Sequence, residues 1–298
     1  MTRWRERLQP HLFVFPSALI VLVFSVYPII WVFRFMFYDY LGYGTPKFVG
    51  LYNFERLLRD TLFWDSLVNT LVFSAGKLAI TLPVAIVLAV ILNSQLKGRS
   101  LLKILYFMPT VISIAVMSVV FYIILNSYNG ILNQYLMRLG LTSDNIPWLS
   151  ADYAMLSVIL VAVWGAIGNN MLLFLAGLQG IPKDVYESAE IDGGNAVQKF
   201  WYITIPMLGP VLQVILMLAI ITSLKGYEGI MVLTGGGPAG TTEVMYLYLF
   251  KLLFPISAGG PGAQDIGYGS AVGFTISVIV GLITACYFLL SKKLNRMN

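Results

Sequence analysis

The sequence has few charged residues. Asp, Glu, Lys and Arg make up 11% of its 298 residues, whereas 58% are apolar. Charged residues form about a quarter of an ordinary soluble domain. This composition excludes that class and indicates a chain that lies in a lipid bilayer.

Cysteine and histidine are almost absent. The single cysteine, Cys286, cannot form an intramolecular disulfide, and the single histidine, His11, cannot build a His/Cys metal site. We therefore expect this chain to bind no metal or cofactor. The net charge of +5 is explained by basic residues gathered on one side of a membrane, so no nucleic-acid partner is expected.

Long apolar runs are abundant instead. Three of them, at 12–33, 104–125 and 266–291, lack acidic, basic and amide side chains and are long enough to cross about 30 Å of hydrocarbon. Three further runs contain only a few polar groups. We predict an all-α integral membrane protein that forms one transmembrane domain over 1–298. Its six spans are expected at about 12–37, 67–93, 102–126, 154–177, 203–224 and 268–291.

The positions of Lys and Arg predict the orientation of these spans. With both termini inside, the inner segments carry eleven of these residues and the longer outer loops carry six. Basic residues in short loops tend to remain cytoplasmic. An N-in, C-in topology follows. In the second outer loop, apolar residues recur at helical spacing from Ile131 to Leu139, which predicts a short amphipathic helix.

A mostly polar segment, 179–202, interrupts the apolar pattern between the fourth and fifth spans. Pro182 suits the first turn of a helix, Asp184 and Glu187 suit its positive end, and Gly193 with Gly194 can end it at positive φ. One short helix over 183–191 is predicted.

A second short helix is predicted directly after the first. Asn195 is a candidate N-cap with Gln198 three residues on, and the helix then runs through Phe200 toward Pro206. Two helices joined by a glycine turn would form a rigid projection suited to gripping a soluble partner.

The spacing Glu187-x-Ala189-x-x-Asp192-Gly193, followed by Phe200, Ile203 and Pro206, resembles the EAA motif of binding-protein-dependent ABC importer permeases. Segments on both sides resemble the maltose-type and glycerol-phosphate-type upstream permeases of the carbohydrate branch. They are Gly177-Leu178-Gln179-x-Ile181-Pro182, Leu233-Thr234-Gly235-Gly236-Gly237-Pro238, Asn69-Thr70, Arg99 with Pro109, and Gly130-x-x-Asn133. The departures are Ser188 and Gly194, where the family usually has alanine.

The resemblance implies a type I importer permease fold in a bacterial inner membrane. The chain would assemble with a second homologous permease, two cytoplasmic ATPase domains and an extracytoplasmic solute-binding protein, and would translocate a sugar or oligosaccharide. It would perform no chemistry itself, since ATP and Mg would be used by the ATPase subunits. The coupling residues implied are Glu187, Ser188, Ala189, Asp192, Gly193, Phe200 and Pro206.

Polar or aromatic groups within the spans are candidates for a substrate path, because such groups are costly in lipid. Trp164 could offer a plate for the apolar face of a sugar, with Gly168 and Asn169 about one turn away. The other candidates are Gln213, Ser223, Tyr227 and Glu228. For each residue, helix packing is the competing interpretation, and Lys77 could equally be held by a carbonyl or a partner subunit.

Other interpretations remain open at this point. The run Gly235 to Thr242 satisfies G-x-G-x-x-G but lacks the phosphate-binding lysine, so a tight turn on the outer face is favoured over a nucleotide site. An importer of glycerol phosphate or a polyol is an alternative. An ATP-independent secondary transporter is disfavoured because Lys77 is essentially the one ionisable residue deep in a span. A membrane enzyme would need a convergent catalytic set that the sequence does not offer.

Overall fold

The computed structural model describes residues 13–94, 96–254 and 264–295. Helices dominate these residues, and a two-stranded hairpin is the exception. In a bilayer a helix satisfies all of its backbone hydrogen bonds internally, which favours this architecture. The predicted all-α membrane fold is confirmed. The chain forms two compact units, one of Met1–Thr61 with Leu249–Val278 and the other of Leu62–Tyr248 with Ile279–Asn298.

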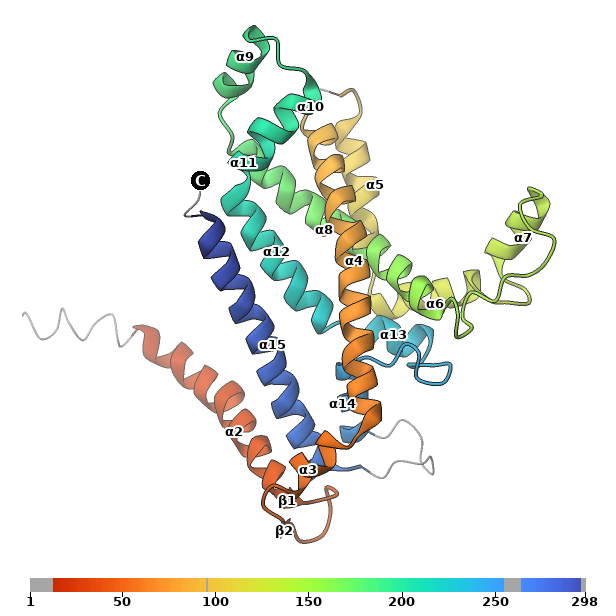
Figure 1. Cartoon of the computed structure of the whole chain (residues 1–298), viewed down its shortest axis with the longest axis vertical. Helices are drawn as coiled ribbons and strands as arrows, with labels where there is room; N and C mark the ends of the chain where they lie inside the picture. The colour runs from red at the N-terminus through yellow and green to blue at the C-terminus, as the bar shows by residue number, and fades with distance from the viewer. Residues whose placement is uncertain (1–12, 95, 255–263, 296–298) are drawn as a thin grey trace, which may run out of the picture. The chain divides into compact units, whose positions relative to one another are not determined.

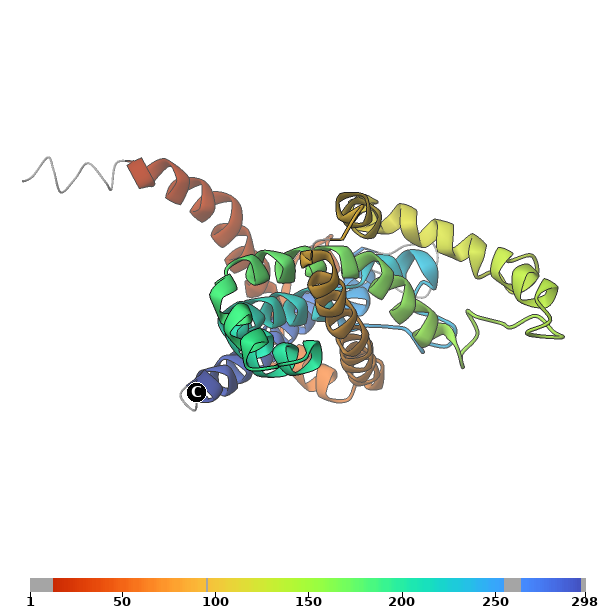
Figure 2. The ribbon, with the colours of Figure 1, turned by 90° about the horizontal axis from the view of Figure 1, so that it is seen from above.

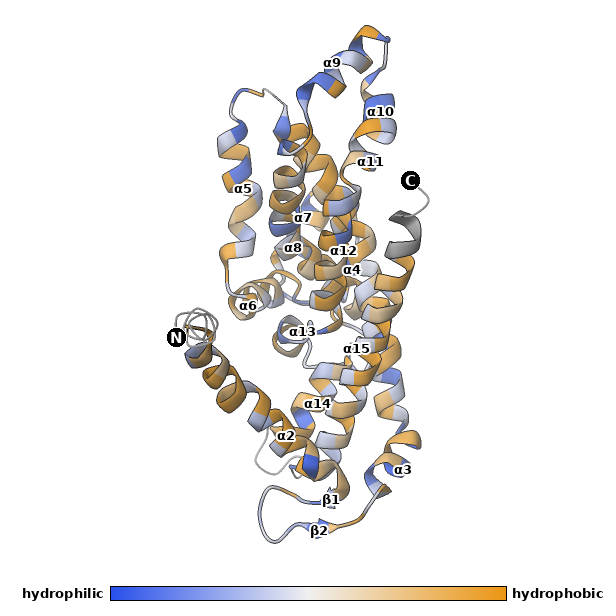
Figure 3. Ribbon diagram, turned by 90° about the vertical axis from the view of Figure 1, so that its left-hand side faces the viewer, coloured by the Kyte–Doolittle hydropathy of each residue, from blue (hydrophilic) through white to orange (hydrophobic). Residues whose placement is uncertain are grey.

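The first unit contains the N-terminal apolar helix, Phe13–Phe37 (Figure 1). It includes a π-helical turn, η1 (Leu22–Val26), then α2 (Tyr27–Phe33) and a 3₁₀ turn, η2 (Arg34–Phe37). Strands β1 (Tyr38–Asp39) and β2 (Lys47–Phe48) pair antiparallel, and α3 (Tyr52–Leu58) follows. Figure 3 shows hydrophobic residues along α2, as expected of a helix that faces lipid or another apolar surface.

Polar contacts hold the first unit together. The Asn53 side chain donates to the carbonyls of Met36 and Tyr38, both at 3.0 Å. Arg56 forms an ion pair of 2.6 Å with Asp265 and lies over the ring of Tyr268 at 3.9 Å from its centroid. These contacts attach α3 to the start of the last helix.

The second unit holds most of the remaining helices. In chain order these are α4 (Thr61–Asn93), α5 (Arg99–Val111), α6 (Ile114–Ile124), α7 (Ile131–Arg138), α8 (Ala154–Gln179), α9 (Lys183–Ile191), α10 (Ala196–Lys199), the π-helical η3 (Phe200–Thr204), α11 (Ile205–Met207), α12 (Gly209–Leu224) and α13 (Glu228–Leu233). Helices α14 (Met245–Leu253) and α15 (Ile266–Asn295) contribute residues to both units. The predicted amphipathic loop helix is present as α7, which lies at the far end of α6, away from α4 (Figures 1 and 2).

The span predicted at 102–126 is not one continuous helix. Helices α5 and α6 meet at an angle of 95°, because Ile112 and Ser113 have extended backbone angles and interrupt the helical hydrogen bonds. Pro109, in the last turn of α5, removes one backbone donor just before the break. Apart from Pro109, the apolar run gave no sign of this break.

Five other helices of the described chain are long and apolar enough to cross a membrane, namely Phe13–Phe37, Thr61–Asn93, Ala154–Gln179, Gly209–Leu233 and Ile266–Ser291. With the bent pair they make up to six spans. The predicted fifth span differs in detail, because η3 and α11 occupy its first residues and the apolar helical segment continues past its predicted end at Leu224, through α13 to Leu233.

Several predicted features fall outside the described residues. These are the start of the first span at Leu12, His11, residues 255–263 of the outer loop predicted between the fifth and sixth spans, and four of the basic residues counted on the inner side, Arg3, Arg5, Arg7 and Arg296.

Two hydrophobic clusters form the core of the second unit. One surrounds Phe73, Val161 and Leu233, and the other surrounds Ala89, Phe174 and Leu208. Helix α5 lies against α8 at Gly168, where an added Cβ would come within 2.4 Å of the Tyr106 carbonyl oxygen. Such close backbone approach is possible only without a side chain.

Candidate functional site

The polar segment folds as two short helices at one end of the second unit (Figures 1 and 3). Helix α9 covers Lys183–Ile191, with Pro182 at its N-cap and Asp184 in its first turn. Gly193 has φ of 79°, and the amide of Gly194 donates to the carbonyl of Ala189 at 2.8 Å. The predicted helix and its glycine stop are confirmed.

The second short helix begins with the predicted cap. The Asn195 side chain accepts from the Gln198 amide, and the Gln198 side chain accepts from the Asn195 amide, each at 2.9 Å. Helix α10 then continues into η3, so Phe200 and Pro206 lie on a nearly continuous helical path into α12. A force applied to α10 therefore has a covalent helical route into this span.

Side-chain contacts fix α9 to the path that follows it. The Tyr186 hydroxyl lies 3.0 Å from the Thr204 hydroxyl, and Lys199 pairs with Glu190 at 2.6 Å. Phe200 packs into the core cluster around Phe174. The two helices of the polar segment are thus held to each other and to the membrane domain.

The surface of the polar segment is both charged and apolar. Glu187, Ser188 and Asp192 are exposed, and among the described residues Glu187 forms no ion pair. Ile191 and Tyr202 are 86% and 80% exposed. Such side chains exposed together on a rigid element are typical of a protein-binding surface.

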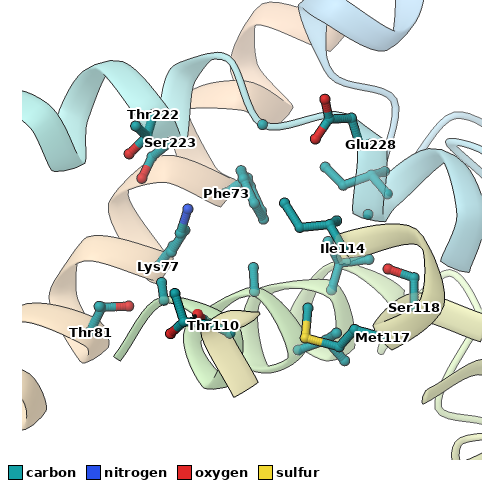
Figure 4. Close-up of a pocket in the computed structure, with 18 of the residues that line it drawn as sticks. Phe73, Lys77, Thr81, Thr110, Ile114, Met117, Ser118, Thr222, Ser223 and Glu228 are labelled. Atoms are coloured by element: carbon teal, nitrogen blue, oxygen red, sulfur yellow. Dashed lines mark hydrogen bonds between the residues drawn. The ribbon is translucent and has the colours of Figure 1, made fainter. Parts of the chain in front are cut away.

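A second site is a pocket in the membrane domain, with a cavity volume of about 280 Å³. It lies among α4, α5, α6, α8, α12 and α13 (Figure 4). Most of its wall is apolar, as at Phe73, Met117 and Val161. Its polar lining consists of Lys77, Thr81, Thr110, Ser118, Asn169, Asn170, Thr222, Ser223, Tyr227 and Glu228.

Several of these polar groups lack partners within the described chain. The hydroxyls of Thr81, Ser118 and Ser223 are buried without a hydrogen bond. Lys77 also has no hydrogen bond or ion pair there, and its ammonium lies 5.9 Å from the centroid of the Phe73 ring. Buried polar groups are usually satisfied, so this pocket is suited to a polar occupant.

The structure brings four of the predicted path residues together. Asn169, Ser223, Tyr227 and Glu228 all line the pocket. The other three lie outside the lining. Trp164 packs edge-on against Phe121 with ring centroids 5.3 Å apart.

Gly168 and Gln213 also lie outside the pocket wall, and both make contacts between helices instead. Gly168 permits the contact between α5 and α8, and the Gln213 carbonyl accepts a hydrogen bond from the Tyr287 hydroxyl at 2.7 Å.

Sequence reasoning missed Phe73, Thr81, Ser118 and Thr222 as lining residues. A detectable signal existed for two of them, because Phe73, Lys77 and Thr81 follow at intervals of four and share one face of α4. Ser118 and Thr222 carried no such signal, since single hydroxyls are common in apolar helices.

The chain resembles known proteins along most of its length. Residues 81–296 match the family described as "Binding-protein-dependent transport system inner membrane component". The arabinooligosaccharides transport system permease protein AraP of Bacillus subtilis (strain 168) is 36% identical, over 98% of this chain and 91% of that protein. The trehalose/maltose transport system permease protein MalF of Thermococcus litoralis is 33% identical, over 96% and 94%.

A third relative and a solved structure also match this chain over most of its length. The lactose transport system permease protein LacF of Rhizobium radiobacter is 31% identical, over 95% of this chain and 93% of that protein. A chain from a bacterial ABC transporter that imports the acidic polysaccharide alginate superposes with a TM-score of 0.82 at 24% identity, over 98% of both chains. The helical arrangement is therefore that of an importer permease.

Proposed function

Since the chain belongs to the binding-protein-dependent transport system inner membrane component family, we propose that it translocates a sugar or oligosaccharide as one permease subunit of an ATP-driven importer. Members of this family are non-catalytic, multi-pass membrane components of such transporters. The bacterial inner membrane is the proposed location, and an extracytoplasmic solute-binding protein is the proposed source of substrate.

The observation that carries the substrate class is the extent of the match to sugar importers. Three relatives named for arabinooligosaccharides, trehalose/maltose and lactose each align over more than nine-tenths of both chains. A permease for glycerol phosphate or a polyol is the second candidate. It would favour a more basic path, and among the described residues Lys77 is the one basic residue in the pocket wall.

The polar segment is the proposed contact with a cytoplasmic ATPase subunit. Exposed Glu187 is available for an intermolecular ion pair, and Ile191 and Tyr202 offer apolar contact. The glycine turn at Gly193 sets the angle between α9 and α10. ATP and Mg would be bound by the ATPase pair, and their closure would act on α12 through η3 and α11.

The pocket is the proposed part of the substrate path that this chain supplies. Its aromatic and apolar wall suits the apolar face of a sugar ring, and its unpartnered hydroxyls suit sugar hydroxyls. A second homologous permease would complete the path. Rocking of the two permeases would then expose the site to each side of the membrane in turn.

The test is uptake by the complete importer in proteoliposomes, with ATP supplied to the ATPase side and the cognate binding protein on the other. Arabinose disaccharide, maltose, lactose and glycerol 3-phosphate are offered in turn. ATP-dependent accumulation of a saccharide supports the proposal. Accumulation of glycerol 3-phosphate alone favours the second candidate, and uptake by this chain without any ATPase would contradict the importer mechanism.

A further inference from the structure

The wall of the pocket contains a cation that the described chain does not neutralise. Lys77 lies in the middle of α4, and no acidic side chain of the described residues lies within ion-pair distance of it. Figure 4 shows its ammonium directed into the pocket. A charge in such an apolar setting is costly unless something pairs with it.

An acidic residue, Glu228, lines the same pocket, and in the part of the chain that the structure describes it forms no ion pair with Lys77. Glu228 is exposed to solvent and begins α13, where the positive end of the helix favours a negative charge. Figure 4 places Glu228 on the other side of the pocket from Lys77. The charge that needs a counterion is therefore that of Lys77.

The neighbours of Lys77 on α4 are suited to a sugar. Phe73 lies four residues before it and presents an aromatic ring, and Thr81 lies four residues after it with a buried, unpartnered hydroxyl. Ser118 and Ser223 add two more buried, unpartnered hydroxyls from α6 and α12. One face of one helix thus offers an aromatic surface, a cation and a hydroxyl in succession.

We propose that Lys77 is a specificity-determining residue that favours saccharides bearing a carboxylate, and that Phe73 and Thr81 bind the adjacent ring. This inference rests on the proposed saccharide transport. A carboxylate brings one negative charge, which matches one ammonium. A phosphate ester brings about 1.5 to 2 charges at neutral pH, and Lys225, which directly precedes the pocket-lining Gly226, does not itself line the pocket.

The experiment measures ligand binding to the purified, complete importer in nanodiscs by saturation-transfer NMR. The probes are a uronic-acid disaccharide, its uncharged methyl ester and a hexose phosphate. The variants are Lys77→Met, which keeps the length without the charge, Lys77→Arg, which keeps the charge, and Lys225→Met as the matched control. Binding is measured without the binding protein, so its own selectivity does not contribute.

The unaltered importer is expected to bind the uronate about tenfold or more tightly than the ester, the range of a charge-assisted hydrogen bond. Lys77→Met should weaken binding of the uronate more than binding of the ester, so that the preference is lost. Lys77→Arg should keep part of the preference, and Lys225→Met should keep all of it.

Three results would overturn the inference. They are equal binding of uronate and ester by the unaltered importer, a preference that persists in Lys77→Met, or a stronger preference for the hexose phosphate. The first of these needs no variant and so does not depend on how the variants fold. If one of these three results is obtained while neutral saccharides are still accumulated with ATP, the inference fails and the proposed function stands. If no saccharide is accumulated, both fail.

Discussion

The side-chain amide of Asn69 donates hydrogen bonds of 2.9 Å to the carbonyl of Gly240, 171 residues away, and of 3.0 Å to the carbonyl of Glu243. The hydroxyl of the adjacent Thr70 accepts from the Met245 amide at 2.9 Å. These bonds attach the glycine-rich loop to α4. The loop itself is a tight turn, as predicted, with positive φ at Gly235, Gly236, Ala239 and Gly240.

Replacing Asn69 by alanine should loosen the glycine-rich loop. The carbonyls of Gly240 and Glu243 would each lose one hydrogen bond, although the Gly240 carbonyl would still accept from the Glu243 amide, at a cost of about 1–3 kcal/mol. Hydrogen exchange of residues 240–245 should become faster in Asn69→Ala. Asn170→Ala is the matched control, because within the described chain the Asn170 side chain bonds only to the carbonyl of Ala166 in its own helix. Unchanged exchange in Asn69→Ala would show that the loop is held by other contacts.

Gly193 should tolerate asparagine better than valine. Its φ of 79° is costly for a β-branched residue, whereas no atom of the described residues lies within 4 Å of an added Cβ, so steric crowding is not the obstacle. Gly193→Val is expected to destabilise the turn by about 1–2 kcal/mol and to lower recovery of the ATPase in co-purification.

Gly98 provides the comparison for this substitution. It has a φ of 82° and is the N-cap residue of α5. As at Gly193, an added Cβ would have no atom of the described residues within 4 Å. Gly98→Val should therefore carry the same backbone strain with full ATPase recovery. Equal losses at both glycines would assign the effect to general destabilisation.

Charge reversal at Glu187 should weaken ATPase association more than charge reversal at Glu190. Both residues are exposed on α9, but Glu190 already pairs with Lys199 within the chain. An exposed pair of that kind contributes about 1 kcal/mol or less. Co-purification of the ATPase with Glu187→Arg and Glu190→Arg importers measures the difference, with the second permease as the recovery standard. A larger loss of ATPase with Glu190→Arg than with Glu187→Arg would show that Glu187 is not the main contact of α9 with the ATPase.

Gly168→Ala should destabilise the membrane domain. The added Cβ would lie 2.4 Å from the Tyr106 carbonyl and 2.7 Å from the Thr110 hydroxyl, so α5 and α8 would have to separate. Overpacking of this kind costs typically about 1–3 kcal/mol. Thermal unfolding in detergent should show a lower midpoint for Gly168→Ala than for Gly209→Ala, where no atom lies within 4 Å. Equal midpoints would contradict the close packing of these helices.

The polar segment was predictable because its signals are local. The cap formed by Asn195 and Gln198 and the stop at Gly193 depend on residues within a few positions of each other. Backbone sterics and short-range hydrogen bonds act on these residues whatever surrounds them. The membrane helices were predictable for a related reason, since the thickness of the hydrocarbon layer sets the length of apolar run that a span needs.

The pocket could not be predicted in the same way. Its spans are apolar on nearly all sides, so periodicity does not reveal which face of α4, α8 or α12 turns inward. Trp164 and Asn169 are five residues apart on α8, yet only Asn169 reaches the pocket wall. The bend at Ile112 and Ser113 likewise decides where α6 places Ser118. In lipid, where apolar faces are nearly equivalent, helix orientation depends on packing between distant segments, and local sequence carries little record of it.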